Sequence, residues 1–134
     1  MNIEDLKKEA KSKKTAADRL EQLARHKDTS IQLAVANNPN APVAALEYLS
    51  GHGKFNILKA VAKNEATPPA VLEKLATHKQ ATVCAVVAGN ISTPLKTLEQ
   101  FVKHPHVSVR EALTGNRSTN AKLYRLLASD TEST

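Results

Sequence analysis

Apolar residues recur along this chain with a helical spacing, and the whole pattern repeats every 26 residues. Within each segment the apolar residues fall at positions i, i+3 and i+4, which places them on one face of an α-helix, whereas a strand would alternate. The sets are Ile31, Ala34 and Val35; Ile57, Ala60 and Val61; Val83, Val86 and Val87; and Val109, Ala112 and Leu113. The pattern predicts the first of two helices in each 26-residue unit.

A second apolar stripe follows in every unit, in the same register. Its members are Leu46, Leu72, Leu98 and Tyr124, with Leu49, Leu75, Phe101 and Leu127. In the central unit we expect Thr67 to be the N-cap, since its hydroxyl can accept a free backbone N–H, and Pro68 to be the first helical residue. Isolated helices shorter than ~12–15 residues are marginal in water. Each unit should therefore bury its stripes against the next unit, as in a solenoid.

Two polar columns keep the same period. They are His26, His52, His78 and His104, and Asn38, Asn64, Asn90 and Asn116. The asparagines lie where the first helix turns into the second, so we expect them to adopt left-handed φ and bond local backbone groups, with Gly89 and Gly115 ending the preceding helices. The histidines follow the second helix, where we expect them to bond free carbonyls. An anion-binding edge, a metal site and a pH sensor are the alternatives for this column.

The period divides the chain into one domain spanning residues 1–128. We expect a capping helix at 1–14, a half repeat at 15–24, full repeats at 25–50, 51–76, 77–102 and 103–128, and a disordered tail at 129–134. No apolar run opens the chain, so no signal peptide or membrane association is expected and a cytoplasmic location is the default. The single cysteine, Cys84, excludes an internal disulfide and the cysteine clusters of zinc and iron–sulfur sites. We expect no metal and no cofactor.

The residues also resemble a known repeat family. Residues 37–49 and 67–76 are similar to the leucine-rich repeat variant (LRV) motif, and residues 104–113 resemble its first half, which grades into HEAT-like repeats. The resemblance covers roughly residues 15–128. It implies an all-α, right-handed α-solenoid of about four and a half two-helix repeats, with one helix of each repeat 3₁₀-like, and a non-enzymatic interaction scaffold without shared catalytic residues. This chain departs from the family in its histidines, which replace a usual Asp, and in its slightly longer unit.

Variable positions on the first helices predict a surface for a protein partner. The expected partner-binding residues are Gln32, Leu33, Leu58, Lys59, Cys84, Ala85, Arg110 and Glu111. Constant columns would build the stack, and variable ones would specify the partner. No Gly-rich phosphate loop and no paired nucleophile and base are present, so we expect a scaffold, monomeric or weakly dimeric, rather than an enzyme.

The charge supports an alternative, nucleic-acid binding. The net charge is +6, and the last unit carries five basic residues against the single acid Glu111. The expected phosphate-binding residues are Arg25, Lys27, Lys54, Lys79, Lys103, Arg110, Arg117 and Lys122. Only four aromatic residues are present, so such binding would rely on phosphates and weaken steeply with salt.

Overall fold

A computed structural model describes residues 2–116, and over that range the chain is entirely helical, with nine α-helices and no strand. They are α1 (Ile3–Lys11), α2 (Ala17–Ala24), α3 (Thr29–Ala36), α4 (Val43–His52), α5 (Phe55–Lys63), α6 (Pro69–Leu75), α7 (Ala81–Gly89), α8 (Leu95–Phe101) and α9 (Val107–Thr114). The predicted all-α class is confirmed for this range. The 3₁₀-like helix expected in each repeat is wrong here, because the second helices are short but α-helical. Arg117, Lys122, Tyr124, Leu127 and the tail 129–134 lie outside the described residues.

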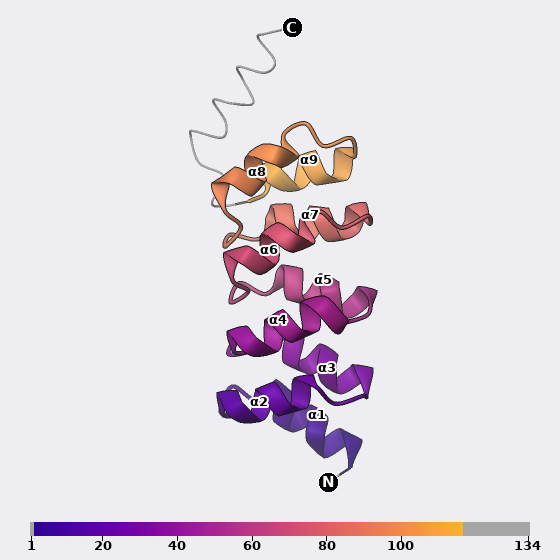
Figure 1. Cartoon of the computed structure of the whole chain (residues 1–134), viewed down its shortest axis with the longest axis vertical. Helices are drawn as coiled ribbons and strands as arrows, with labels where there is room; N and C mark the ends of the chain where they lie inside the picture. Colours follow the sequence, from indigo (N-terminus) through magenta and orange to yellow (C-terminus); the bar gives the residue numbers. More distant parts are fainter. Residues whose placement is uncertain (1, 117–134) are drawn as a thin grey trace, which may run out of the picture.

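The helices form two layers stacked along the long axis of the molecule (Figure 1). In the first layer, α1, α3, α5, α7 and α9 contact one another in sequence, and in the second layer α2 contacts α4 and α4 contacts α6. The loops leading from a second-layer helix to the next first-layer helix gather on one side, which we name the joint edge (right in Figure 1). The turns within each unit gather on the opposite side, the turn edge. Residues separated by 26 positions therefore recur at equivalent places on successive units.

The predicted apolar stripes form the core between these layers. Ile31, Ile57, Val83 and Val109 are buried in the first layer, and Leu46, Leu72 and Leu98 in the second. Val86 and Ala112, predicted to be buried, are only half-buried and pack at the margin of the core. Because each helix has at most 10 residues, the core is continuous only through contacts between units.

The second helices begin one residue later than expected. Pro68 is the N-cap of α6, without a side-chain capping bond, and Pro69 is the first helical residue. The Thr67 hydroxyl is buried and donates to the Val61 carbonyl at 2.6 Å, as Thr93 does to Val87 and Thr15 to Glu9. Threonine therefore gives a second hydrogen bond to a carbonyl in the last turn of the preceding helix, which also accepts the N–H of the C-cap residue.

Gly53 lies in the loop between α4 and α5, where neighbouring atoms leave no room for a side chain. A Cβ at this position would lie 2.6 Å from the Leu49 carbonyl oxygen and 2.7 Å from Ile57 Cγ2. Gly53 ends α4, the longest helix described, and its N–H donates to the same Leu49 carbonyl at 2.8 Å. Any side chain here would push α4 away from α5.

Candidate functional site

The most regular polar feature is a ladder of asparagine side chains along the turn edge. Each Nδ2 donates to two backbone carbonyls of the preceding unit, 28 and 26 residues earlier. The acceptors and distances are Ala10 (2.8 Å) and Ser12 (3.0 Å) for Asn38, Ala36 (2.8 Å) and Asn38 (2.9 Å) for Asn64, Ala62 (2.7 Å) and Asn64 (3.0 Å) for Asn90, and Ala88 (2.6 Å) and Asn90 (2.9 Å) for Asn116. The ladder thus joins each unit to the one before it.

The other end of the same amide shapes the turn. Oδ1 of Asn38, Asn64 and Asn90 accepts the backbone N–H two residues later, at 2.8–2.9 Å. No residue from 2 to 116 has positive φ, so the expected left-handed asparagine is wrong. The Asn side chain forms the turn by hydrogen bonding, which leaves the backbone in an ordinary conformation. Likewise, Gly89 and Gly115 end their helices without left-handed φ.

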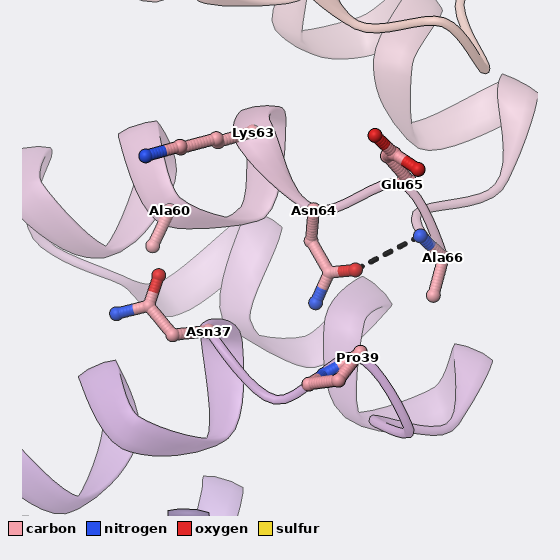
Figure 2. Close-up of a pocket in the computed structure, with 7 residues that line it drawn as sticks. All are labelled: Asn37, Pro39, Ala60, Lys63, Asn64, Glu65 and Ala66. Carbon is pink, nitrogen blue, oxygen red and sulfur yellow. Dashed lines mark hydrogen bonds between the residues drawn. The ribbon is translucent and has the colours of Figure 1, made fainter.

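A hollow of about 600 Å³ opens on the turn edge beside Asn64 (Figure 2). It is lined by Asn37, Pro39, Ala60, Lys63, Asn64, Glu65 and Ala66. In Figure 2 the Asn64 amide oxygen points to the Ala66 N–H, and the side chains of Lys63 and Glu65 do not approach each other. None of the predicted site residues lines this hollow, and its most central polar group, the Asn64 amide, is already bonded within the ladder.

The histidine side chains form hydrogen bonds in the joint loops that were not predicted from the sequence. His26, His78 and His104 each accept a backbone N–H at Nδ1, from residues 28, 80 and 106, at 3.0–3.1 Å. These donors are the N-cap residues of the next first-layer helix. Only His52 bonds a carbonyl, that of Tyr48 one turn earlier in its own helix, at 2.9 Å from Nδ1. The other three imidazoles must be unprotonated at Nδ1 in order to accept.

Three of the residues predicted to bind a partner, Gln32, Cys84 and Arg110, form hydrogen bonds within the stack. Positions 32, 58, 84 and 110 are each 26 residues apart, and except for Leu58 their side chains bond carbonyls at or just after the end of the preceding second-layer helix. Gln32 Nε2 donates to Ala24 at 3.3 Å, Cys84 Sγ contacts the Ala76 and His78 carbonyls at 3.3 Å, and Arg110 Nη1 donates to His104. Cys84 is 1% exposed, and burial raises the pKa of its thiol. Assigning Cys84 to a partner surface is therefore wrong, and Gln32 and Arg110 help to hold the joints.

The remaining predicted partner-binding residues are accessible. Leu33, Leu58, Lys59 and Ala85 are half-buried, and Glu111 is exposed. Lys59 Nζ lies 5.5 Å from the centre of the Phe55 ring, which is itself 41% exposed. A smaller groove of about 240 Å³ lies near the starts of α3 and α5, lined by Thr29, Ser30, Leu33, Lys54, Asn56 and Ile57. This groove brings together Leu33, from the predicted protein-binding set, and Lys54, from the predicted nucleic-acid-binding set.

The predicted phosphate-binding residues within the described range are all exposed. Five of them occupy the joints, namely Arg25, Lys27, Lys54, Lys79 and Lys103, and we name this set the joint ridge. The Arg25 guanidinium lies 4.4 Å from the centre of the Tyr48 ring, which stacks on His52 at 4.3 Å. The single acid in the joints, Asp28, is bonded to Ser30, and these bonds lower the pKa of its carboxyl. The joints therefore present net positive charge.

A column of acids, not identified from the sequence, lies on the second-layer helices α2, α4, α6 and α8. Its members, also 26 residues apart, are Glu21, Glu47, Glu73 and Glu99. Glu21 is half-buried and the other three are exposed. The structure places one member of this column, Glu21, beside a joint cation, because Glu21 and Arg25 line the same shallow hollow.

Neither the described surface nor the comparisons with other proteins identify a known site. Within residues 2–116 no three His, Cys, Asp or Glu side chains are grouped so that they could hold a metal ion. In the same range, no helix has the length and the apolar run that a membrane span requires. Protein-family models, curated proteins and solved structures were each compared with the chain, and none of them matches it.

Proposed function

We propose that this chain is a right-handed α-solenoid of about four and a half 26-residue, two-helix repeats, of the LRV and HEAT-like type. The asparagine ladder supports this proposal, because the same pair of interunit bonds recurs at one spacing from Asn38 to Asn116. The contacts between successive first-layer helices support it as well. In such an array each repeat is stable only when it packs against its neighbours.

The proposed function is that of a non-enzymatic scaffold that binds a partner protein. One observation carries this proposal: the regular Asn, Thr and His side chains are bonded within or between the units. Over residues 2–116 no buried side-chain polar atom lacks a hydrogen-bond partner. These groups are engaged in holding the stack, so the less regular, accessible side chains are the ones that remain for recognition. An elongated stack offers such residues a long continuous surface.

Affinity purification tests this function. The tagged chain is used as bait in a lysate of its source organism, beside a variant carrying Leu58→Gln and Lys59→Glu, two accessible positions on α5. We expect the wild type to retain a stoichiometric protein that the variant loses, while both chains show the same helical circular dichroism and a similar melting temperature. Recovery of no stoichiometric protein would contradict the scaffold function. Equal recovery by both baits would show that this face of α5 is not the binding surface.

Binding to a nucleic-acid backbone is a second candidate, favoured by the exposed cations of the joint ridge. Labelled duplex DNA and RNA titrated at low and moderate salt test it, because phosphate-led affinity falls steeply as salt increases. The absence of any binding at low salt would remove this candidate.

A further inference from the structure

The two edges of the stack contain the same local hydrogen bond, in which a side chain accepts the backbone N–H two residues later. On the turn edge the acceptor is the amide oxygen of an asparagine, and the donors are the N–H groups of residues 40, 66 and 92. On the joint edge the acceptor is Nδ1 of a histidine, and the donors are the N–H groups of residues 28, 80 and 106. The two edges therefore differ in the chemistry of one acceptor atom.

This difference makes one edge sensitive to protons. An amide oxygen does not titrate near neutral pH, whereas an imidazole has an unperturbed pKa of ~6.5. When an imidazole takes up a proton, both ring nitrogens become donors, so Nδ1 can no longer accept an N–H. Acid should therefore break these side-chain bonds on the joint edge and leave those of the turn edge intact.

His52 supplies a contrast within the same column. Its Nδ1 lies 2.9 Å from the carbonyl oxygen of Tyr48, so this ring nitrogen carries the hydrogen and donates it. A protonated imidazole keeps that hydrogen, and the bond survives. His52 is exposed, whereas His26, His78 and His104 are half-buried. The loop between α4 and α5 should therefore not respond to acid as the other three joint loops do.

The loop around His26 holds charges of both signs. Its cations are Arg25 and Lys27, and its acid is Asp28, whose carboxyl interacts with the His26 ring. Bonds to Ser30 lower the pKa of the Asp28 carboxyl, so this acid keeps its charge in the range where imidazole titrates. From the neighbouring helices α2 and α4, the groups near Arg25 are Glu21, Tyr48 and, stacked on Tyr48, His52.

The loop around His78, residues 76–80, contains no acid, and its one cation is Lys79. The group that approaches from α7 is the Cys84 thiol, whose sulfur lies 3.3 Å from the His78 carbonyl oxygen. Burial raises the pKa of this thiol, so it stays neutral as pH falls. A proton on His78 would thus add a second positive charge to a loop that has no carboxylate of its own.

The loop around His104, residues 102–106, also lacks an acid and contains Lys103 and His106. The His106 ring centre lies 5.6 Å from that of His104, and Arg110 of α9 donates to the His104 carbonyl. From α8 the His104 ring meets only the uncharged Phe101 ring, at 5.9 Å between centres. Burial, and then His106 and Arg110, hold the pKa of His104 below its usual value. The neutral, accepting form is the one that this loop favours, and its bond is lost as pH falls through the lowered pKa.

We propose that the joint edge is a proton-sensitive hinge. Protonation of His26, His78 and His104 releases the N–H groups of the N-cap residues of α3, α7 and α9. The amide bonds of the turn edge and the His52 bond persist. The starts of three first-layer helices thus gain freedom on one side of the stack while the opposite side stays joined (Figure 1). This inference concerns the stack itself and goes beyond the proposed scaffold function.

The test uses the full, isotope-labelled chain and NMR between about pH 8 and about pH 5. Ring-nitrogen shifts report which nitrogen carries the hydrogen, and at high pH we expect a bare Nδ1 in His26, His78 and His104 and a hydrogen on Nδ1 in His52. Amide hydrogen exchange, expressed as protection relative to an unfolded chain at the same pH, then compares the edges. As the imidazoles titrate, we expect protection at residues 28, 80 and 106 to fall by about fivefold, the effect of one net hydrogen bond. Protection at residues 40, 66 and 92 should not change.

Asparagine is the conservative replacement, because its amide oxygen accepts the same N–H on the turn edge without titrating. The hinge variant carries His26→Asn, His78→Asn and His104→Asn, and the matched control carries His52→Asn, which removes the one histidine of the column whose Nδ1 donates. We expect the hinge variant to keep its protection at residues 28, 80 and 106 in acid. The control should lose it as the wild type does.

Three results would overturn the inference. A hydrogen on Nδ1 of His26, His78 and His104 at high pH would exclude the bonds on which the hinge depends, and this measurement needs no variant. Equal responses to acid at the two edges of the wild type would show a general effect of pH on the fold. The same response in the hinge variant and the wild type would show that the joint histidines do not cause it.

Discussion

Replacing Asn90 by alanine tests how strongly the ladder joins the units. Asn90 is 4% exposed, and its amide makes three bonds: Nδ2 to the Ala62 and Asn64 carbonyls at 2.7 and 3.0 Å, and Oδ1 from the Ser92 N–H at 2.8 Å. The Asn64 carbonyl keeps a second bond, from the Thr67 N–H. The Ala62 carbonyl, in the last turn of α5, has no further partner within its own helix.

The expected loss follows from these bonds. A net hydrogen bond contributes about 1 kcal/mol, and a buried carbonyl left without a donor costs about 1–3 kcal/mol. We therefore expect Asn90→Ala to lower the free energy of unfolding by about 3 kcal/mol, a large fraction of the 5–15 kcal/mol typical of a domain. For a chain of 134 residues, with an unfolding entropy of about 2.1 cal/mol/K per residue, this corresponds to roughly 10 °C in melting temperature.

Thermal and urea unfolding followed by circular dichroism measure the effect, and two further variants serve as comparisons. Asn37→Ala removes an exposed asparagine that is not a member of the ladder, and we expect a change within ~0.5 kcal/mol. Asn90→Asp keeps the acceptor for Ser92 but places a carboxylate against two carbonyls, so it should be at least as unstable as the alanine variant. If Asn90→Ala unfolds like the wild type, or if Asn90→Asp is tolerated at neutral pH, the ladder does not hold the units together as described.

Three further predictions concern other side chains of the stack. Thr93→Val removes the hydroxyl that donates to Val87 at 2.6 Å and should cost about 1–2 kcal/mol in urea unfolding, whereas exposed Thr82→Val should be nearly neutral. The pKa of His104 is held below its usual value by burial first and then by His106 and Arg110, so its contribution to stability is present above pH ~6.5 and is lost as pH falls through the lowered pKa. His104→Asn keeps an acceptor for the residue 106 N–H without titrating, and should reduce the loss of melting temperature between about pH 7 and about pH 5; an unchanged slope would contradict the role of Nδ1. Cys84, 1% exposed and with its thiol pKa raised by burial, should react with a disulfide reagent slowly in buffer and rapidly in urea; rapid, complete labelling of the folded chain would disprove its burial.

The helices and the core could be predicted because they depend on local periodicity. Ile31, Ile57, Val83 and Val109 mark one face at helical spacing, and burial follows from that face alone. The turn from Thr67 to Pro69 was less predictable, because either proline could start the helix. The Thr67 hydroxyl could also either cap the following helix or bond a carbonyl of the preceding one. Its choice depends on the Val61 carbonyl, six residues earlier.

The roles of the polar columns could not be predicted, for a different reason. The acceptors of Asn64 are backbone carbonyls 26 and 28 residues away, and a carbonyl leaves no mark in the sequence. The residue type differs among the equivalent positions Gln32, Cys84 and Arg110, which suggested that this position has no structural role. All three side chains nevertheless bond backbone carbonyls at the joints. Chemically different donors can bond backbone carbonyls of the same joint, so sequence variety conceals a similar structural role.

The Asn64 amide needs only the two carbonyls at residues 36 and 38, and the Asn90 amide needs only those at residues 62 and 64. Each unit therefore supplies its successor with the same pair of acceptors that it receives from its predecessor. Evolution could lengthen or shorten such a rod by duplicating or excising one whole module, because the new junction would reproduce the old one. An insertion or deletion of any other size would leave an amide facing the wrong carbonyls.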